Sequence, residues 1–313
     1  MVPLVIFAAI GVLVLVSSLS GSQYLVRFIT NMLMWVTLTQ SLNTITGYTG
    51  RVDFGHVIFF GVGAYAMALM ISSTGSWMLG LIAAAISGII LAIVIGYPTL
   101  RLQGAYFAIA TWSFAEAMKQ LVFNTPQLGG SFGISIQTSL TSSQIQTLMA
   151  IVAALSILLN IFIERSRLGK ALIAIRGDET AALAFGVNAP LYRLVAYILS
   201  SIPASLSGAV YAIWIGYVYP GDVFHGLKTD MMFVMLLLGG AGSYLGAFLG
   251  SVILSVAYEI LWTFFSEQLY LVILGMLLVA IVLLMPNGIV GLLKIRTASA
   301  RKLLISFIPR SAR

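Results

Sequence analysis

Few residues in this chain are equipped for chemistry, and they are scattered. The 313 residues include 16 Lys and Arg, 9 Asp and Glu, two His and no Cys. His56 and His225 lie too far apart in the sequence to predict a local zinc site. The absence of cysteine excludes disulfides, thiolate metal ligands and a cysteine nucleophile. Gly169-Lys170 lacks the upstream glycine of a phosphate-binding loop, and no His-Glu-x-x-His or Gly-x-Ser-x-Gly motif occurs. We therefore expect no enzyme, and no metal ion or cofactor held by this chain.

One polar segment, residues 176–188, carries a clear helix signal. Asp178 is a good N-cap, Glu179 suits the positive end of a helix dipole, and Gly186 can adopt the left-handed conformation that ends a helix. The predicted helix is only about 11 Å long, so it must pack against something to be stable. The residues between its ends are small or apolar, and suit docking in a groove: Thr180, Ala181, Ala182, Leu183, Ala184 and Phe185. The alternative is an ordinary loop helix that lies on the rest of the chain.

A second unusual segment, residues 47–65, is rich in glycine and holds three ionisable residues close together. Arg51, Asp53 and His56 fall at the predicted end of an apolar span, where an ion pair could hold a bend. The flanking glycines, including Gly50 and Gly55, permit close backbone approach. The segment is interpreted as a tight turn between helices, and a proton relay through His56 is the alternative.

Two further groups of polar residues lie inside apolar spans. Glu116 and Lys119 are neighbours on one helix face and are expected to neutralise each other, whereas Glu259 has no obvious local partner. The second span is unusually polar, with Asn31, Gln40 and Asn43 among its residues. Such a span either lines a wet path or forms hydrogen bonds with neighbouring helices.

These residues must be positioned by helices in a lipid bilayer. Hydrophobic residues make up 60% of the chain and charged residues only 8%, where soluble domains carry roughly 25%. Apolar runs long enough for spans of roughly 20 residues recur along most of the sequence. We predict an all-α, polytopic membrane bundle of eight to ten transmembrane helices, as one domain over residues 1–293. The run 230–240 is too short to cross the bilayer as a helix and is interpreted as re-entrant or broken. The predicted spans are 3–19, 24–46, 55–72, 76–97, 103–123, 143–163, 194–218, 230–240, 244–264 and 269–285.

The distribution of positive charge predicts the orientation. Five Lys or Arg lie in the loop 164–193 and six in the tail 294–313. Because cytoplasmic loops retain Lys and Arg, both segments and both termini are expected in the cytoplasm of a multi-pass inner-membrane protein. This retention explains the net charge of +7, so no nucleic-acid partner is expected. The tail either lies on anionic membrane lipid or serves for retention alone.

Several separated blocks, taken together, resemble a known family. The chain closely resembles the permease subunits of branched-chain amino-acid ABC importers, especially the LivM type, from about residue 40 to Gly288. Urea and short-chain amide permeases share most of these blocks. The blocks are Gly47-Tyr-Thr-Gly50, Gly55-His56, Phe59-Phe60-Gly61-Val-Gly63-Ala-Tyr65, Leu102-Gln-Gly104-Ala-Tyr106-Phe107, Ser166-Arg167-Leu-Gly169, Ala174-Ile-Arg176, Gly239-Gly240-Ala-Gly242-Ser243 and Pro286-Asn287-Gly288.

The resemblance implies a transport subunit that works with several partners. These are a second, LivH-type permease, two cytoplasmic ATPases that bind ATP and Mg, and an external substrate-binding protein. It also implies that residues 178–186 form the coupling helix, since Thr180-Ala181-Ala182-x-x-x-Gly186 has the spacing of the importers' Glu-Ala-Ala-x-x-x-Gly loop, with the acid shifted to Glu179. Arg51 and Asp53 stand where many relatives have Gln and Ser, and could pair with each other. The rival from another class is an ion-coupled secondary transporter that works alone.

Overall fold

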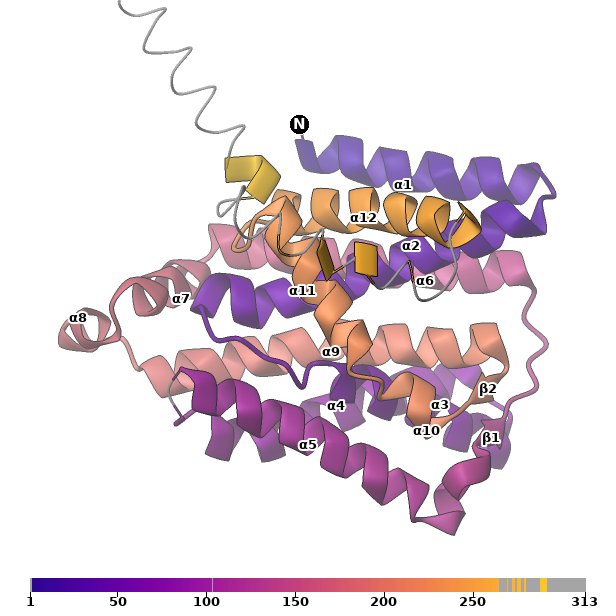
Figure 1. The fold of residues 1–313 in the computed structure, drawn as a ribbon, viewed down its shortest axis with the longest axis horizontal. Coiled ribbons are helices and arrows are strands. Elements are labelled where there is room, and N and C mark those ends of the chain that lie inside the picture. Colours follow the sequence, from indigo (N-terminus) through magenta and orange to yellow (C-terminus); the bar gives the residue numbers. More distant parts are fainter. Residues whose placement is uncertain are drawn as a thin grey trace, which may run out of the picture.

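The chain folds as a helical bundle in which most helices run roughly along one direction (Figure 1). The computed structural model describes residues 2–102, 104–264, 269, 272–273, 275–276, 279 and 288–291. The helices and strands are α1 (Val2–Leu19), α2 (Gln23–Leu42), the π-helix η1 (Asn43–Gly47), α3 (Val57–Thr74), α4 (Trp77–Thr99), α5 (Ala105–Phe123), the 3₁₀ turns η2 (Pro126–Leu128) and η3 (Gly130–Phe132), β1 (Ile134–Ser135), α6 (Ser142–Arg165), α7 (Arg167–Gly177), α8 (Glu179–Ala184), α9 (Ala189–Ile215), β2 (Tyr217–Val218), α10 (Pro220–Val223), α11 (Leu227–Gly239) and α12 (Tyr244–Phe264).

The predicted spans up to residue 264 match helices to within a few residues, but their number as membrane crossings is not confirmed. Among the described residues, five helices are long and apolar enough to cross a bilayer: α3, α4, α6, α9 and the Tyr244–Leu261 part of α12. The helix α11 has 13 residues, about 20 Å of helix, and ends before Gly240, as expected for a broken span. The predicted span 269–285 lies mostly outside the described residues, and the tail 294–313 lies entirely outside them.

The core is organised around α9, which packs on α2, α3, α4 and α6. Glycine allows the closest approach: a Cβ added to Gly63 of α3 would overlap the carbonyl oxygen of Ser205 on α9, and one added to Gly208 would overlap that of Phe60. Small residues at helix crossings are typical of membrane bundles, where backbone contact replaces the burial of bulky side chains. This packing fixes α9 as the support for the elements at its two ends.

The two ends of the bundle differ. At one end, on the left in Figure 1, the carboxyl end of α2 lies near α7 and α8. At the other end β1 and β2 pair antiparallel, with Ile134 opposite Val218. The predicted loop 164–193 is mostly helical, because α6 continues to Arg165 and Ser166 then caps a new helix, α7, by accepting from the Gly169 N–H. The helix α7 was not predicted from the sequence. Its basic residues obscure a short apolar face, which includes the buried Leu172 and Ile175.

Candidate functional site

The site begins with α8, which forms as its sequence predicts. The Asp178 carboxylate accepts hydrogen bonds from the backbone N–H groups of Thr180 at 2.9 Å and Ala181 at 3.1 Å. These bonds, together with one from the Thr180 hydroxyl, lower the pKa of Asp178. The helix ends at Phe185, and Gly186 follows with φ +81°. Only glycine adopts this backbone conformation readily, so Gly186 itself determines where α8 ends.

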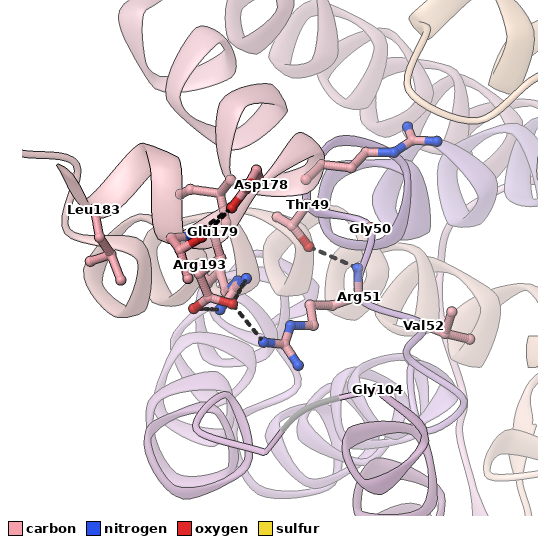
Figure 2. A pocket seen from close by; sticks show the side chains of 12 residues that line it. Thr49, Gly50, Arg51, Val52, Gly104, Asp178, Glu179, Leu183 and Arg193 are labelled. Carbon is pink, nitrogen blue, oxygen red and sulfur yellow. Dashed lines mark hydrogen bonds and ion pairs between the residues drawn. The ribbon is translucent and has the colours of Figure 1, made fainter. Parts of the chain in front are cut away.

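An ion pair fastens α8 to the bundle. Arg193 of α9 donates from Nη1 to Glu179 Oε1 at 2.6 Å and from Nη2 to Glu179 Oε2 at 2.8 Å. Arg51 approaches the same carboxylate, with Nη2 at 3.5 Å from Oε2. Figure 2 shows Arg193 and Arg51 converging on Glu179. The hydrogen bonds from Arg193 lower the pKa of Glu179, whereas burial and the neighbouring Arg193 lower the pKa of Arg51.

One side of α8 packs on the bundle, and the other side is exposed. Ala182 is only 4% exposed and packs with Ile175 of α7 and Ala189 of α9. In contrast, Leu183 is 51% exposed and Phe185 is 89% exposed. Ala181 and Ala184 are also exposed. The alternative of a helix that lies on the rest of the chain is therefore present, and docking of its exposed side in a groove stays a prediction.

A cavity of about 590 Å³ separates α8 from the segment after α2. Its lining combines three arginines, Arg51, Arg176 and Arg193, with the acids Asp178 and Glu179. Arg176 also donates from Nη1 to the Gly47 carbonyl at 2.5 Å, which ties α7 to the end of α2. From the sequence, Arg193 was counted only among the five basic residues of the loop 164–193, and Arg176 was assigned no partner. Arg193 directly precedes the predicted span 194–218. An arginine at the end of an apolar span indicates a buried partner, which here is Glu179.

The segment 50–56 is held by a buried polar chain rather than by the predicted pairing of Arg51 with Asp53. Asp53 Oδ2 lies 2.9 Å from His56 Nδ1, and His56 Nε2 lies 2.7 Å from Ser41 Oγ. The Ser41 hydroxyl donates to the Ser200 carbonyl of α9 at 2.5 Å. The expected pairing was wrong because Arg51 points the other way, toward Glu179 and the Leu102 carbonyl.

Two glycines let this segment pass close to its neighbours. Gly50 has φ +73°, and a Cβ there would lie 3.0 Å from Arg176 Cγ. A Cβ at Gly55 would overlap the carbonyl oxygen of Thr111 on α5. The close turn predicted from the glycines is thus present, and His56 occupies its buried side with no exposed surface.

Gln40 of α2 and Asn43 of η1 form hydrogen bonds with other elements. Gln40 Nε2 donates to the Tyr244 carbonyl at 2.8 Å, and Asn43 Nδ2 donates to Asn160 Oδ1 at 3.0 Å. Asn43 Oδ1 accepts from the Gly242 N–H at 2.9 Å. Asn31 is half-buried. Interhelical bonding, one of the two sequence-based interpretations, is therefore present at Gln40 and Asn43, and their assignment to a path stays a prediction.

The acids inside the apolar helices both have partners. Lys119 Nζ lies 2.7 Å from the Glu116 carboxylate, as the spacing predicts. The Tyr24 hydroxyl donates to Glu259 at 2.9 Å, a contact between α2 and α12 that local sequence could not reveal. Among the described residues, no group of three or more His, Cys, Asp or Glu side chains is arranged to hold a metal ion.

The chain is similar to known transport proteins along most of its length. The model of a family described as "Branched-chain amino acid transport system / permease component" matches residues 24–282. The high-affinity branched-chain amino acid transport system permease protein LivM of Escherichia coli is 28% identical over 86% of this chain and 71% of its own length. The corresponding LivH protein of Salmonella typhimurium is 28% identical over 86% of this chain and 97% of its own length. A probable LivM of Methanocaldococcus jannaschii is 25% identical over 72% and 79%.

Proposed function

The chain belongs to the family of branched-chain amino acid transport permease components, and from this premise we propose that it is the permease subunit of an ATP-driven importer for branched-chain amino acids. In this proposal it is a multi-pass inner-membrane subunit with both termini in the cytoplasm. It forms a translocation path with a second, LivH-type permease. An external binding protein delivers the substrate, and ATP with Mg is bound and hydrolysed by two separate cytoplasmic ATPase subunits.

The observation that carries the proposal is the exposed apolar surface of α8. Phe185 and Leu183 are large apolar side chains at the end of the bundle, held out by a helix that is itself anchored by Glu179 and Arg193. Phe185, 89% exposed, and the neighbouring Leu183, 51% exposed, together form an apolar surface available to a partner. A rigid link from this surface to α9 suits a coupling helix, because force applied at α8 reaches the core of the bundle through α9.

The proposal predicts a specific pattern of contacts with the ATPase. The chain has no cysteine, so single cysteines can be introduced without background. Ala181→Cys and Ala184→Cys place a thiol on the exposed side of α8 and should crosslink to a co-expressed ATPase subunit. Ala182→Cys, one residue away but buried, is the matched control and should not. Crosslinking at Ala182 alone, or at none of the three positions, would contradict the assignment of α8 as the coupling helix.

A further inference from the structure

The cavity between α8 and the segment after α2 has a surplus of positive charge. Three guanidinium groups line it, and each carries five N–H donors. Of the two lining carboxylates, Asp178 already accepts three hydrogen bonds from Thr180 and Ala181. The two carboxylates leave one of the three positive charges without a counter-charge among the lining residues, and both oxygens of Glu179 are already engaged by Arg193.

One of these cations is buried and incompletely paired. The Arg193 side chain is 5% exposed, and its Nε has no hydrogen-bond partner in the part of the chain that the structure describes. Burial, and after it the proximity of Arg193, makes the charged form of Arg51 less favourable and lowers the pKa of Arg51. Two arginines held this close, with one shared carboxylate, create a positive potential that an added anion would relieve.

The rest of the lining restricts the kind of anion. Val52, Ile175 and Leu183 add aliphatic surface beside the arginines. The lining thus combines aliphatic surface with several charged groups, and a cavity of about 590 Å³ is large enough for a small molecule. A doubly charged phosphate gains nothing from the aliphatic walls and is repelled by Glu179 and Asp178. A monoanionic carboxylate that carries its own ammonium and an aliphatic side chain matches all three parts of the lining.

We propose that this cavity binds a zwitterionic aliphatic amino acid, with its carboxylate on Arg51 and Arg193, its ammonium beside Glu179, and its branched side chain against Val52 and Leu183. The inference rests on the proposed function for its ligand, because the amino acid that the importer carries has this chemistry. It places a second, cytoplasmic-side site for the carried substrate at the base of the coupling helix. A ligand there bridges the segment 49–52, α8 and α9.

Binding of radiolabelled L-leucine tests this site directly. The detergent-purified complex of this chain with its permease and ATPase partners, without the external binding protein, should bind leucine saturably. Arg51→Gln should weaken binding roughly tenfold or more, since it removes a charge-assisted bond. Arg101→Gln is the matched control, because Arg101 stacks on the Tyr97 ring at 4.5 Å and does not line the cavity. Absence of saturable binding, or equal affinity in wild type and Arg51→Gln, overturns the proposal.

Cysteine protection locates the bound leucine without relying on an arginine variant. Val52 and Phe54 are similarly exposed, at 38% and 40%, but only Val52 lines this cavity. A neighbouring, mostly apolar cavity contains both residues. Leucine should slow maleimide labelling of Val52→Cys and leave Phe54→Cys unchanged. Protection of both positions would place leucine in the neighbouring cavity, and protection by inorganic phosphate but not by leucine would assign an anion of another class; each outcome overturns the proposal.

Uptake measured after the same complexes are reconstituted into proteoliposomes separates this inference from the proposed function. ATP-dependent leucine uptake without leucine protection of Val52→Cys overturns the cavity site alone. Absence of leucine uptake by the complete complex, with binding protein and ATP present, overturns the proposed function, whereas the binding and protection results still decide the site.

Discussion

Arg193, near the start of α9, holds Glu179, in the first turn of α8, through two parallel hydrogen bonds of 2.6 and 2.8 Å. This fork geometry fixes both the distance and the orientation between the two helices, which a single bond to a lysine would not do. The pair therefore fixes α8 to the core of the bundle.

Loss of the Glu179 charge should loosen α8. In Glu179→Gln the buried Arg193 guanidinium loses its anionic partner, at a cost on the order of 1–3 kcal/mol, less than for a fully buried pair since Glu179 is partly exposed. Hydrogen exchange of the α8 amides should accelerate roughly 10- to 100-fold. The control is Glu116→Gln, which removes a more exposed pair on α5 and should leave α8 unaffected. Unchanged exchange in Glu179→Gln would show that α8 is held by apolar packing alone.

The same pair predicts how α8 responds to pH. The pKa of Glu179 is lowered from its ordinary value of 4.5 by Arg193, so the pair's contribution is complete above that value. It is lost only as pH falls through the lowered pKa of the folded state. Exchange of the α8 amides, corrected for the intrinsic pH dependence, should therefore be constant from pH 8 to pH 5 and should rise below about 4.5. A loss of protection near pH 6 would assign control of α8 to another group.

The buried chain through His56 should be structural. The His56 ring lies between Ser41 Oγ, 2.7 Å from Nε2, and Asp53 Oδ2, 2.9 Å from Nδ1. His56→Ala then leaves a fully buried Asp53 carboxylate without its partner, which costs about 3–5 kcal/mol. The measurement is the thermal midpoint of the folded fraction by size-exclusion chromatography. His225→Ala, at the exposed histidine, should be neutral; a stable His56→Ala protein that has lost only transport would instead support a proton relay.

The glycine contacts between α3 and α9 should tolerate no side chain. Gly63→Ala would force the two backbones apart, because its Cβ would overlap the Ser205 carbonyl, and the expected loss is about 1–3 kcal/mol or more. Gly11→Ala is the control, since nothing lies within 4 Å of a Cβ at that position of α1. Expression and thermal stability of the two variants check this. Equal stability would mean that α3 and α9 can separate without penalty.

The sequence predicts those structural features whose signal lies in neighbouring residues or in apolar periodicity. The Asp178 cap and the Gly186 stop concern neighbouring backbone groups, and the helix ends follow apolar length, so both were predicted. The pairing of Glu179 with Arg193 spans 14 residues, and that of Ser41 with His56 depends on how α2 meets the next segment. Because side-chain direction decides such contacts, the expected Arg51–Asp53 pair was wrong while the Glu116–Lys119 pair, on one helix face, was right.

We propose that this chain moves substrate only when a separate ATPase acts on it through α8. Leucine uptake into proteoliposomes tests it most directly, with the chain reconstituted alone and as the complete complex with its binding protein. We expect accumulation of leucine against a gradient by the complete complex with ATP, and none by the isolated chain under a proton or sodium gradient. Accumulation of leucine by the isolated chain, driven by an ion gradient and without ATP, would contradict it.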